Sequence, residues 1–164
     1  MSGSFVQNVA DLGSDRSRSA SFTGPLPLHL DHADVVGPAH VSVRLDALGA
    51  LVVATGTVGL HVEFVCTRCL AGWSEERSQS FRATFAPEPT ADEYAIEEDD
   101  WIDLEAALRD EVALSLPLLP RCRAECAGLC PTCGTDLNTG ECPGHPAEED
   151  TPFAALLGLQ IPDQ

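Results

Sequence analysis

The sequence contains no lysine, and all of its fixed positive charge comes from nine arginines. Twenty-six aspartates and glutamates oppose them, so the formal net charge is -17 at pH 7. Affinity for nucleic acid comes largely from neutralised phosphates, and this composition therefore disfavours direct binding of RNA, DNA or an anionic membrane. It favours a basic partner instead.

Segments that direct a chain to a membrane are also missing. Residues 1–24 contain no apolar run of the signal-peptide type, and no stretch reaches the length of a transmembrane helix. The seven cysteines are an odd number in a chain without an export signal, which indicates a reducing compartment. We therefore expect a cytoplasmic protein.

Motifs that carry catalysis are scarce. The sequence has no glycine-rich phosphate loop and no nucleophile elbow. The histidines in the first half of the chain are scattered and are interpreted as surface or strand residues: His29, His32, His40 and His61. We expect no enzyme and no small-molecule substrate.

One cysteine pair leaves a redox alternative open. In Cys66-Thr67-Arg68-Cys69, the arginine can lower the pKa of a neighbouring thiol, as redox motifs require. The pair follows a strand into a turn, however, whereas the thioredoxin-like motif opens a helix. We expect Cys66 in the core and Cys69 in the turn, and keep a thiol-redox protein using both as an alternative.

Hydrophobic periodicity predicts an α+β fold with a small antiparallel sheet or partly open barrel. From Ala39 onward apolar and polar residues alternate, as in strands with one buried face. A turn is expected at residues 48–50, and a bulge or bend at Gly56 and Gly59. The expected inward-facing residues are Val41, Val43 and Leu45, then Val58, Leu60, Val62, Phe64 and Cys66, then Phe81, Ala83 and Phe85.

One main helix is predicted from Asp103 to about Leu116, with Asp103 as its N-cap. Its apolar stripe consists of Leu104, Leu108 and Val112. The acidic run over residues 87–100 before the helix is either solvated surface or a landing site for a basic partner.

These features divide the chain into four parts. Residues 1–38 are a partly mobile N-terminal segment, and residues 39–117 are an α+β core domain. Residues 118–145 form a cysteine-rich metal-binding segment, and residues 146–164 form a tail with a short helix over 152–157.

The cysteine-rich segment holds five of the seven cysteines: Cys122, Cys126, Cys130, Cys133 and Cys142. Two intervening residues let the sulfurs of Cys130 and Cys133 turn to one side, and Gly134 permits the left-handed backbone that closes such a turn. We predict a structural zinc ion (Zn2+) held by four of these five cysteines. Cys130 and Cys133 are the ligands that spacing supports best.

The other ligands remain open at this point. Cys122 and Cys126 can complete a local four-thiolate site, and Cys142, with or without His145, can supply the second half of a zinc-ribbon-like loop. A third arrangement brings in Cys66 and Cys69 and ties the sheet to the tail. An iron–sulfur centre and free cysteines without metal are further alternatives.

Three motifs in a fixed order carry a family resemblance: VxxxCTRCL from Val62, DLEAALRDEVALSLPLLPRC from Asp103 and CAGLCPTCGTDLNTGEC from Cys126. Over residues 56–160 the chain resembles the bacterial YceD-like family (DUF177), described as large ribosomal RNA subunit accumulation proteins. The resemblance implies a non-enzymatic cytoplasmic protein that supports synthesis, processing or stability of the large-subunit (23S) rRNA in ribosome biogenesis. Family members commonly end the cysteine segment with a close cysteine pair. Gly144 replaces the second member here, which weakens Cys142 as a ligand and favours Cys122 and Cys126.

The acidic charge and the resemblance together suggest an indirect action on rRNA. We hypothesise that the protein holds a nascent ribosomal protein or a basic rRNA-processing factor. The acidic run from Glu88 to Asp103 would steer that partner, and exposed apolar residues would supply affinity. The alternative is a direct RNA-binding zinc module that uses Arg121 and Arg123.

Overall fold

The computed structural model describes residues 5–13 and 16–145. The chain forms two units, Met1–Cys126 and Ala127–Gln164. The short helix predicted over residues 152–157 lies outside the described residues. Within the ranges that are described, no helix is long and apolar enough to cross a membrane.

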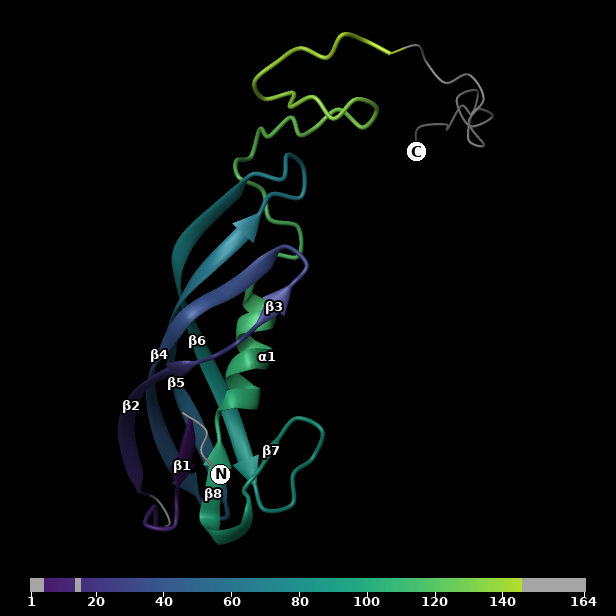
Figure 1. The fold of residues 1–164 in the computed structure, drawn as a ribbon. Helices are drawn as coiled ribbons and strands as arrows, with labels where there is room; N and C mark the ends of the chain where they lie inside the picture. Colours follow the sequence, from purple (N-terminus) through teal and green to yellow (C-terminus); the bar gives the residue numbers. More distant parts are fainter. Residues whose placement is uncertain (1–4, 14–15, 146–164) are drawn as a thin grey trace, which may run out of the picture. The chain divides into compact units, whose positions relative to one another are not determined.

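The first unit is built on one main sheet, shown in Figure 1. Its strands are ordered β2 (Ser17–Pro25), β4 (Ala33–Leu48), β5 (Leu51–Val65), β6 (Gly72–Ala86) and β7 (Tyr94–Ala95), and β3 (His29–Leu30) pairs with β4. All of these pairs are antiparallel except β6 with β7, which is parallel. A separate two-stranded sheet joins β1 (Val6–Asn8) to β8 (Trp101–Asp103), which follows the 3-10 turn η1 (Glu98–Asp100).

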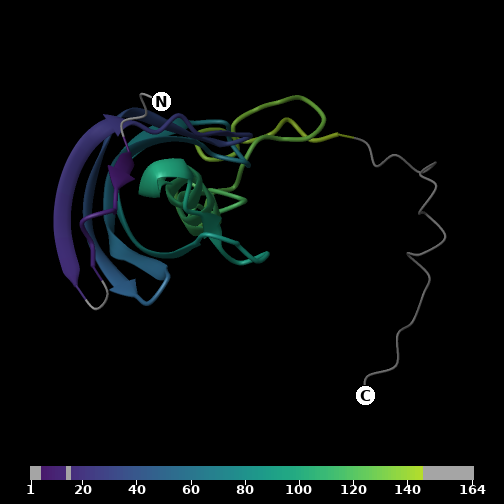
Figure 2. The ribbon, with the colours of Figure 1, turned by 90° about the horizontal axis from the view of Figure 1, so that it is seen from below.

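The main sheet curls around the helix α1 (Glu105–Ser115) and stays open (Figure 2). From the helix side, Leu108 and Val112 are fully buried, and so is Leu104 just before the helix. Removing each such side chain from water contributes roughly 1.5–3 kcal/mol. A mostly β structure with one helix in the described ranges confirms the predicted α+β fold with an open sheet.

The alternation predicted for the strands is also confirmed. In β4, Val41, Val43 and Leu45 are buried, whereas Ser42 and Arg44 point to solvent. The inward residues of the next two strands are buried as well: Val58, Leu60, Val62 and Phe64 in β5, and Phe81, Ala83 and Phe85 in β6. Gly49, with φ of 64°, forms the tight turn between β4 and β5.

Of the bulge or bend predicted at Gly56 and Gly59, the bulge lies in the neighbouring strand: β5 pairs without interruption with β6, and its pairing with β4 is irregular next to Gly59, which pairs with His40. The register shift lies in β4, between Val36 and His40, where Gly37 has a positive φ of 72°. Gly56 is required for a different reason, the close approach of β5 to β4. A Cβ atom at this position would overlap the carbonyl oxygen of Ser42, so only glycine allows the two strands to approach this closely.

Two element boundaries differ from the sequence-based prediction. Residues 17–25, expected within a partly mobile segment, form β2 and pair along β4 as far as Pro25. The helix begins at Glu105, two residues later than predicted, because Asp103 ends β8. The Asp103 carboxylate nevertheless accepts the backbone N–H of Glu105 at 2.8 Å, so it does bind the first turn of the helix.

The described part of the second unit, residues 127–145, is held by turns instead of regular elements. Asp136 and Leu129 form an isolated bridge, and the Asp136 carboxylate accepts hydrogen bonds from the backbone and the side chain of Asn138. The Asn138 side-chain oxygen in turn accepts the backbone N–H of Ala127 at 2.9 Å. A polar network therefore connects the start of this segment to residues 136–138.

Candidate metal centres

Seven cysteines and one histidine converge in two separate sets of four. The four-cysteine group contains Cys66, Cys69, Cys122 and Cys126, and the Cys3His group contains Cys130, Cys133, Cys142 and His145. In each group the ligand atoms lie within 4.8 Å of one another, and all seven cysteines are free thiols. Each group can hold a metal ion.

The four-cysteine group is built on the turn that follows β5. Cys66 accepts at its carbonyl from the N–H of Leu70, and its own N–H donates to the carbonyl of Ala71, both at 2.9 Å. This closed turn brings the Cys66 and Cys69 sulfurs toward the segment after α1. There, Cys66 Sγ lies 3.9 Å from Cys126 Sγ, and Cys69 Sγ lies 3.6 Å from Cys122 Sγ.

The two residues inside the turn connect it to the segment after α1. The N–H and hydroxyl of Thr67 both donate to the Pro120 carbonyl, at 3.0 and 3.2 Å. Arg68 Nη1 donates to the Cys126 carbonyl at 2.6 Å. The redox alternative gave Arg68 the role of lowering the pKa of a neighbouring thiol. In the structure its guanidinium fixes the backbone of a ligand residue, a supporting role typical of groups around metal sites.

Backbone hydrogen bonds favour the thiolate form that a metal needs at one ligand of the four-cysteine group, Cys66. Burial alone would raise the pKa of Cys66, but backbone N–H groups of Cys122, Cys69 and Arg68 are directed at its sulfur, and its pKa falls to about 6. Loss of hydration and the neighbouring thiols raise the pKa of Cys122 to about 12. Without a metal, the group therefore shares its protons unevenly.

The Cys3His group repeats the same turn. The Cys130 N–H donates to the Thr135 carbonyl at 2.8 Å, and the Gly134 N–H donates to the Cys130 carbonyl at 2.9 Å. Cys142 Sγ then lies 3.5 Å from Cys130 Sγ and 3.8 Å from Cys133 Sγ. His145 completes the set, with Nε2 at 3.1 Å from Cys142 Sγ.

Hydrogen bonds also shift the pKa values of ligand residues in the Cys3His group. The Thr135 hydroxyl, 3.1 Å from Cys133 Sγ, and the Thr135 N–H lower the pKa of Cys133 to about 6. The Cys133 and Cys130 sulfurs in turn raise the pKa of His145. Thiolates and imidazole are ligands that zinc prefers, so the donor set fits the predicted metal.

The five cysteines predicted as ligands are thus divided between the two groups. Cys122 and Cys126 join Cys66 and Cys69, whereas Cys130, Cys133 and Cys142 join His145. The repeated CxxC spacing was the signal for the Cys66 pair. Nothing in the spacing indicated the roles of Thr67, Arg68 and Thr135.

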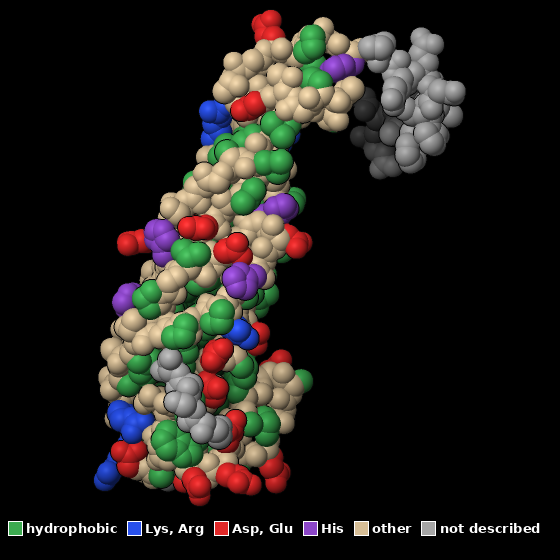
Figure 3. Space-filling view, viewed as in Figure 1, with side chains coloured by type: hydrophobic (Ala, Val, Ile, Leu, Met, Phe, Trp, Pro, Cys, Tyr) green, Lys and Arg blue, Asp and Glu red, His purple; other side chains and the backbone are tan. Residues whose placement is uncertain are grey.

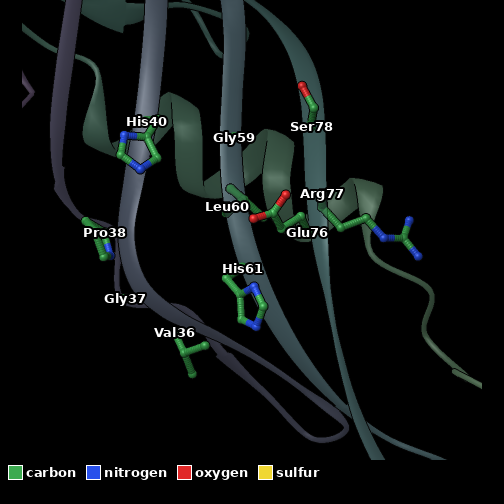
Figure 4. Close-up of a pocket in the computed structure, with 10 residues that line it drawn as sticks. All are labelled: Val36, Gly37, Pro38, His40, Gly59, Leu60, His61, Glu76, Arg77 and Ser78. Atoms are coloured by element: carbon green, nitrogen blue, oxygen red, sulfur yellow. The ribbon is translucent and has the colours of Figure 1, made fainter.

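A groove of about 680 Å³ lies over β4, β5 and β6. Figure 4 shows His40, His61, Glu76 and Arg77 along it. His40 Nδ1 is 2.9 Å from the Thr23 hydroxyl, as expected for a strand histidine. Among the described residues, only the two cysteine-containing groups bring three or more possible metal ligands together. The groove therefore adds no third candidate metal site.

The acidic segment, residues 88–103, carries mostly exposed carboxylates and is hydrogen-bonded to other parts of the first unit. Figure 3 shows acidic side chains gathered at the end of this unit that carries β1 and β8. Asn8 Nδ2 donates to the Asp99 carbonyl and the Val9 N–H to the Asp100 carbonyl, at 2.9 and 2.8 Å. Asp99 and Asp100 both have positive φ values, near 60°. Trp101 beside them is 39% exposed.

The start of the same segment is tied to α1. The Tyr94 hydroxyl donates to Asp110 Oδ2 at 2.8 Å. Burial, followed by this bond and the Asp110 charge, raises the pKa of Tyr94 to about 12. The acidic segment is therefore fixed at both β7 and β8, and its carboxylates are presented from a defined backbone.

Comparison with known proteins gives a family match that covers both metal-ligand groups. A family model described as "Large ribosomal RNA subunit accumulation protein YceD" matches residues 54–160. Similar curated proteins come from mycobacteria and are themselves called uncharacterized. One from Mycobacterium leprae is 33% identical over 134 residues, which cover 77% of this chain and 61% of the relative.

Relatives from Mycobacterium bovis and Mycobacterium tuberculosis are each 35% identical over 131 residues, which cover 75% of this chain and 62% of theirs. The chain thus spans about three fifths of the length of these relatives. No solved structure matches it significantly.

Proposed function

Because the chain belongs to the YceD family of large ribosomal RNA subunit accumulation proteins, we propose that it supports accumulation of the 23S rRNA in the cytoplasm. It acts as a non-enzymatic factor by binding a basic protein, either a ribosomal protein or an rRNA-processing factor. The observation that carries the proposal is the net charge of -17 without a single lysine. Such a surface attracts basic proteins and repels the phosphate backbone of RNA.

The acidic segment is the surface we propose for the partner. Its carboxylates at Glu97, Glu98 and Asp99 are exposed and steer a basic protein over long range. Steering alone gives little affinity, because exposed ion pairs contribute about 0–1 kcal/mol each. Trp101 supplies an apolar anchor beside them, in keeping with the enrichment of tryptophan among residues that dominate binding energy.

Zinc is the metal we propose for the two ligand groups, in a structural role. Sites with four protein ligands leave no open coordination position for a substrate, which favours scaffolding over catalysis. In this account Cys66 and Cys69 serve as ligands and not as a redox pair.

The partner proposal is tested by affinity purification after cross-linking in cells, with the captured proteins identified by mass spectrometry. The test variant carries Glu97→Gln, Glu98→Gln and Asp99→Asn. We expect it to lose about tenfold of its basic ribosomal or processing partner, because three exposed charges of about 0.5 kcal/mol each correspond to roughly that factor.

The matched control changes the same number of exposed acids elsewhere in the first unit, by Asp31→Asn, Glu63→Gln and Glu76→Gln. It should retain the partner. Equal capture by both variants contradicts the proposal. RNA that stays bound to the test variant but is lost on Arg121→Ala with Arg123→Ala would support the direct RNA-binding alternative.

A further inference from the structure

The ligands described above form two sets that share no residue, and each set lies within one unit of the chain. We propose that the protein binds two zinc ions at once, one in the four-cysteine group and one in the Cys3His group, with different tasks. The first ion fastens a loop onto a core that is folded without it. The second ion is what folds residues 127–145 of the second unit. This inference rests on the structural zinc proposed above, but not on the proposed partner or on the role in rRNA accumulation.

Sulfur positions in both groups match a tetrahedral metal site. With zinc–sulfur bonds of about 2.3 Å, the sulfurs of a tetrahedron lie roughly 3.8 Å apart. The observed separations are 3.6 and 3.9 Å in the four-cysteine group, and 3.5 and 3.8 Å in the Cys3His group. A disulfide would need about 2.05 Å. Four ligands in each set close both sites.

Both groups are also built on the same ligand turn. In each turn the first cysteine N–H donates to the carbonyl five residues later, and its carbonyl accepts the N–H four residues later. The residue at that fourth position has a positive φ in both turns, 59° at Leu70 and 73° at Gly134. Two turns of one design, each with its own second ligand pair, indicate two independent centres.

The first unit does not need its metal to hold the sheet together. Its core contains more than twenty buried residues, most of them on β4, β5, β6 and α1, among them Phe64, Phe85 and Leu108. The four-cysteine group lies at the end of β5 and links that end to Cys122 and Cys126, more than fifty residues later. Metal binding here closes a long loop on an existing structure.

The described part of the second unit has no comparable core. Within residues 127–145, the one buried side chain is that of Cys130, itself a ligand. Leu129 and Leu137 are only half-buried, and the remaining stabilisation comes from the polar network around Asp136 and Asn138. Where so little apolar surface is buried, metal binding and folding become the same event.

The stoichiometry is tested by elemental mass spectrometry on the full chain, purified without chelator. We expect two zinc ions per chain. Cys69→Ser or Cys122→Ser should each leave one ion, and so should Cys133→Ser or Cys142→Ser. Cys69→Ser combined with Cys133→Ser should leave none. Cys122 and Cys133 are exposed, so the Cys122→Ser and Cys133→Ser variants test each group with little effect on the core.

One zinc ion in the wild-type protein, or a single substitution that releases both, would overturn the proposal. Cobalt replacement gives a second readout, because a site with four thiolates and one with three thiolates and an imidazole absorb differently. The Cys133→Ser variant should retain the four-thiolate spectrum, and the Cys122→Ser variant the three-thiolate spectrum.

The difference in tasks is tested by amide hydrogen exchange before and after chelation. Protection in residues 127–140 should be lost, whereas β4, β5 and β6 should keep theirs. Protection that persists in residues 127–140 without metal, or that collapses throughout the sheet, contradicts the assigned tasks. Failure of the partner-binding variants would leave each of these measurements unchanged, so the two proposals fail separately.

Discussion

At the scale of single residues, Leu70 and Gly134 occupy the same place in the two ligand turns. Glycine adopts a positive φ without steric cost, whereas an L-residue with a Cβ loses about 1–2 kcal/mol there. Leu70 accepts this cost and is 61% exposed, so no burial of its side chain compensates. The ligand geometry therefore dictates the backbone. The sequence predicted both turns, but it predicted a left-handed residue only at Gly134, because the glycine signal is absent at Leu70.

Gly134→Ala should weaken metal binding by the Cys3His group roughly fivefold to thirtyfold, which corresponds to about 1–2 kcal/mol of backbone strain. A Cβ at residue 134 meets no atom within 4 Å, so no steric contact adds to the loss. The measurement is a competition titration with a chromophoric chelator.

Gly140→Ala is the matched control, because its φ is not in the left-handed region and a Cβ there makes only ordinary contacts, the nearest at 3.8 Å. Equal losses in the two variants would show that backbone strain at residue 134 is not the cause.

Arg68→Ala should weaken metal binding by the four-cysteine group about tenfold to a hundredfold, the usual effect of removing a group that orients a ligand. The lost bond is the one from the guanidinium to the Cys126 carbonyl. Arg82→Ala removes the same charge from an exposed position in β6 and should leave the affinity unchanged. If both substitutions have the same effect, net charge and not the bond to Cys126 controls the affinity.

At the scale of elements, periodicity predicted the buried faces well and the irregularities poorly. A glycine in a strand can mark a bulge or a close approach of two backbones, and only the partner strand distinguishes the two. Gly56 serves the close approach, whereas the register shift falls near Gly37. The edge strand β2 was missed for another reason. Its residues are mostly polar and only half-buried on their inner side, so the apolar alternation that indicates a strand is weak.

Leu108→Ala should destabilise the first unit by about 2–5 kcal/mol, because it leaves a cavity between α1 and the sheet. Leu108 is fully buried, whereas Leu114 on the same helix is 85% exposed. Leu114→Ala should therefore change stability by no more than about 0.5 kcal/mol. Urea unfolding followed by circular dichroism measures both, and equal midpoints for the two variants would refute the assignment of Leu108 to the core.

At the scale of the whole molecule, the ligand sets depend on folding that sequence spacing does not reveal. Neighbouring cysteines suggested one local site, yet the fold brings Cys66 next to Cys126 across sixty residues. The ligand set is determined by α1, because this helix returns the chain to the end of β5 and so places Cys122 and Cys126 next to Cys66 and Cys69. The net charge, in contrast, follows from the sequence without knowledge of the fold. It remains the basis for a basic partner, and the acidic segment gives that charge a defined position.

The central claim is that the acidic segment allows this protein to support accumulation of the large-subunit rRNA. The most direct test is the ratio of large- to small-subunit rRNA in cells whose only copy carries Glu97→Gln, Glu98→Gln and Asp99→Asn. Because partner binding falls about tenfold, we predict a ratio clearly below that of wild-type cells and shifted toward that of cells without the protein. The control with Asp31→Asn, Glu63→Gln and Glu76→Gln should have a normal ratio, with both variants present at wild-type levels. A normal ratio in the acidic-segment variant would contradict the account.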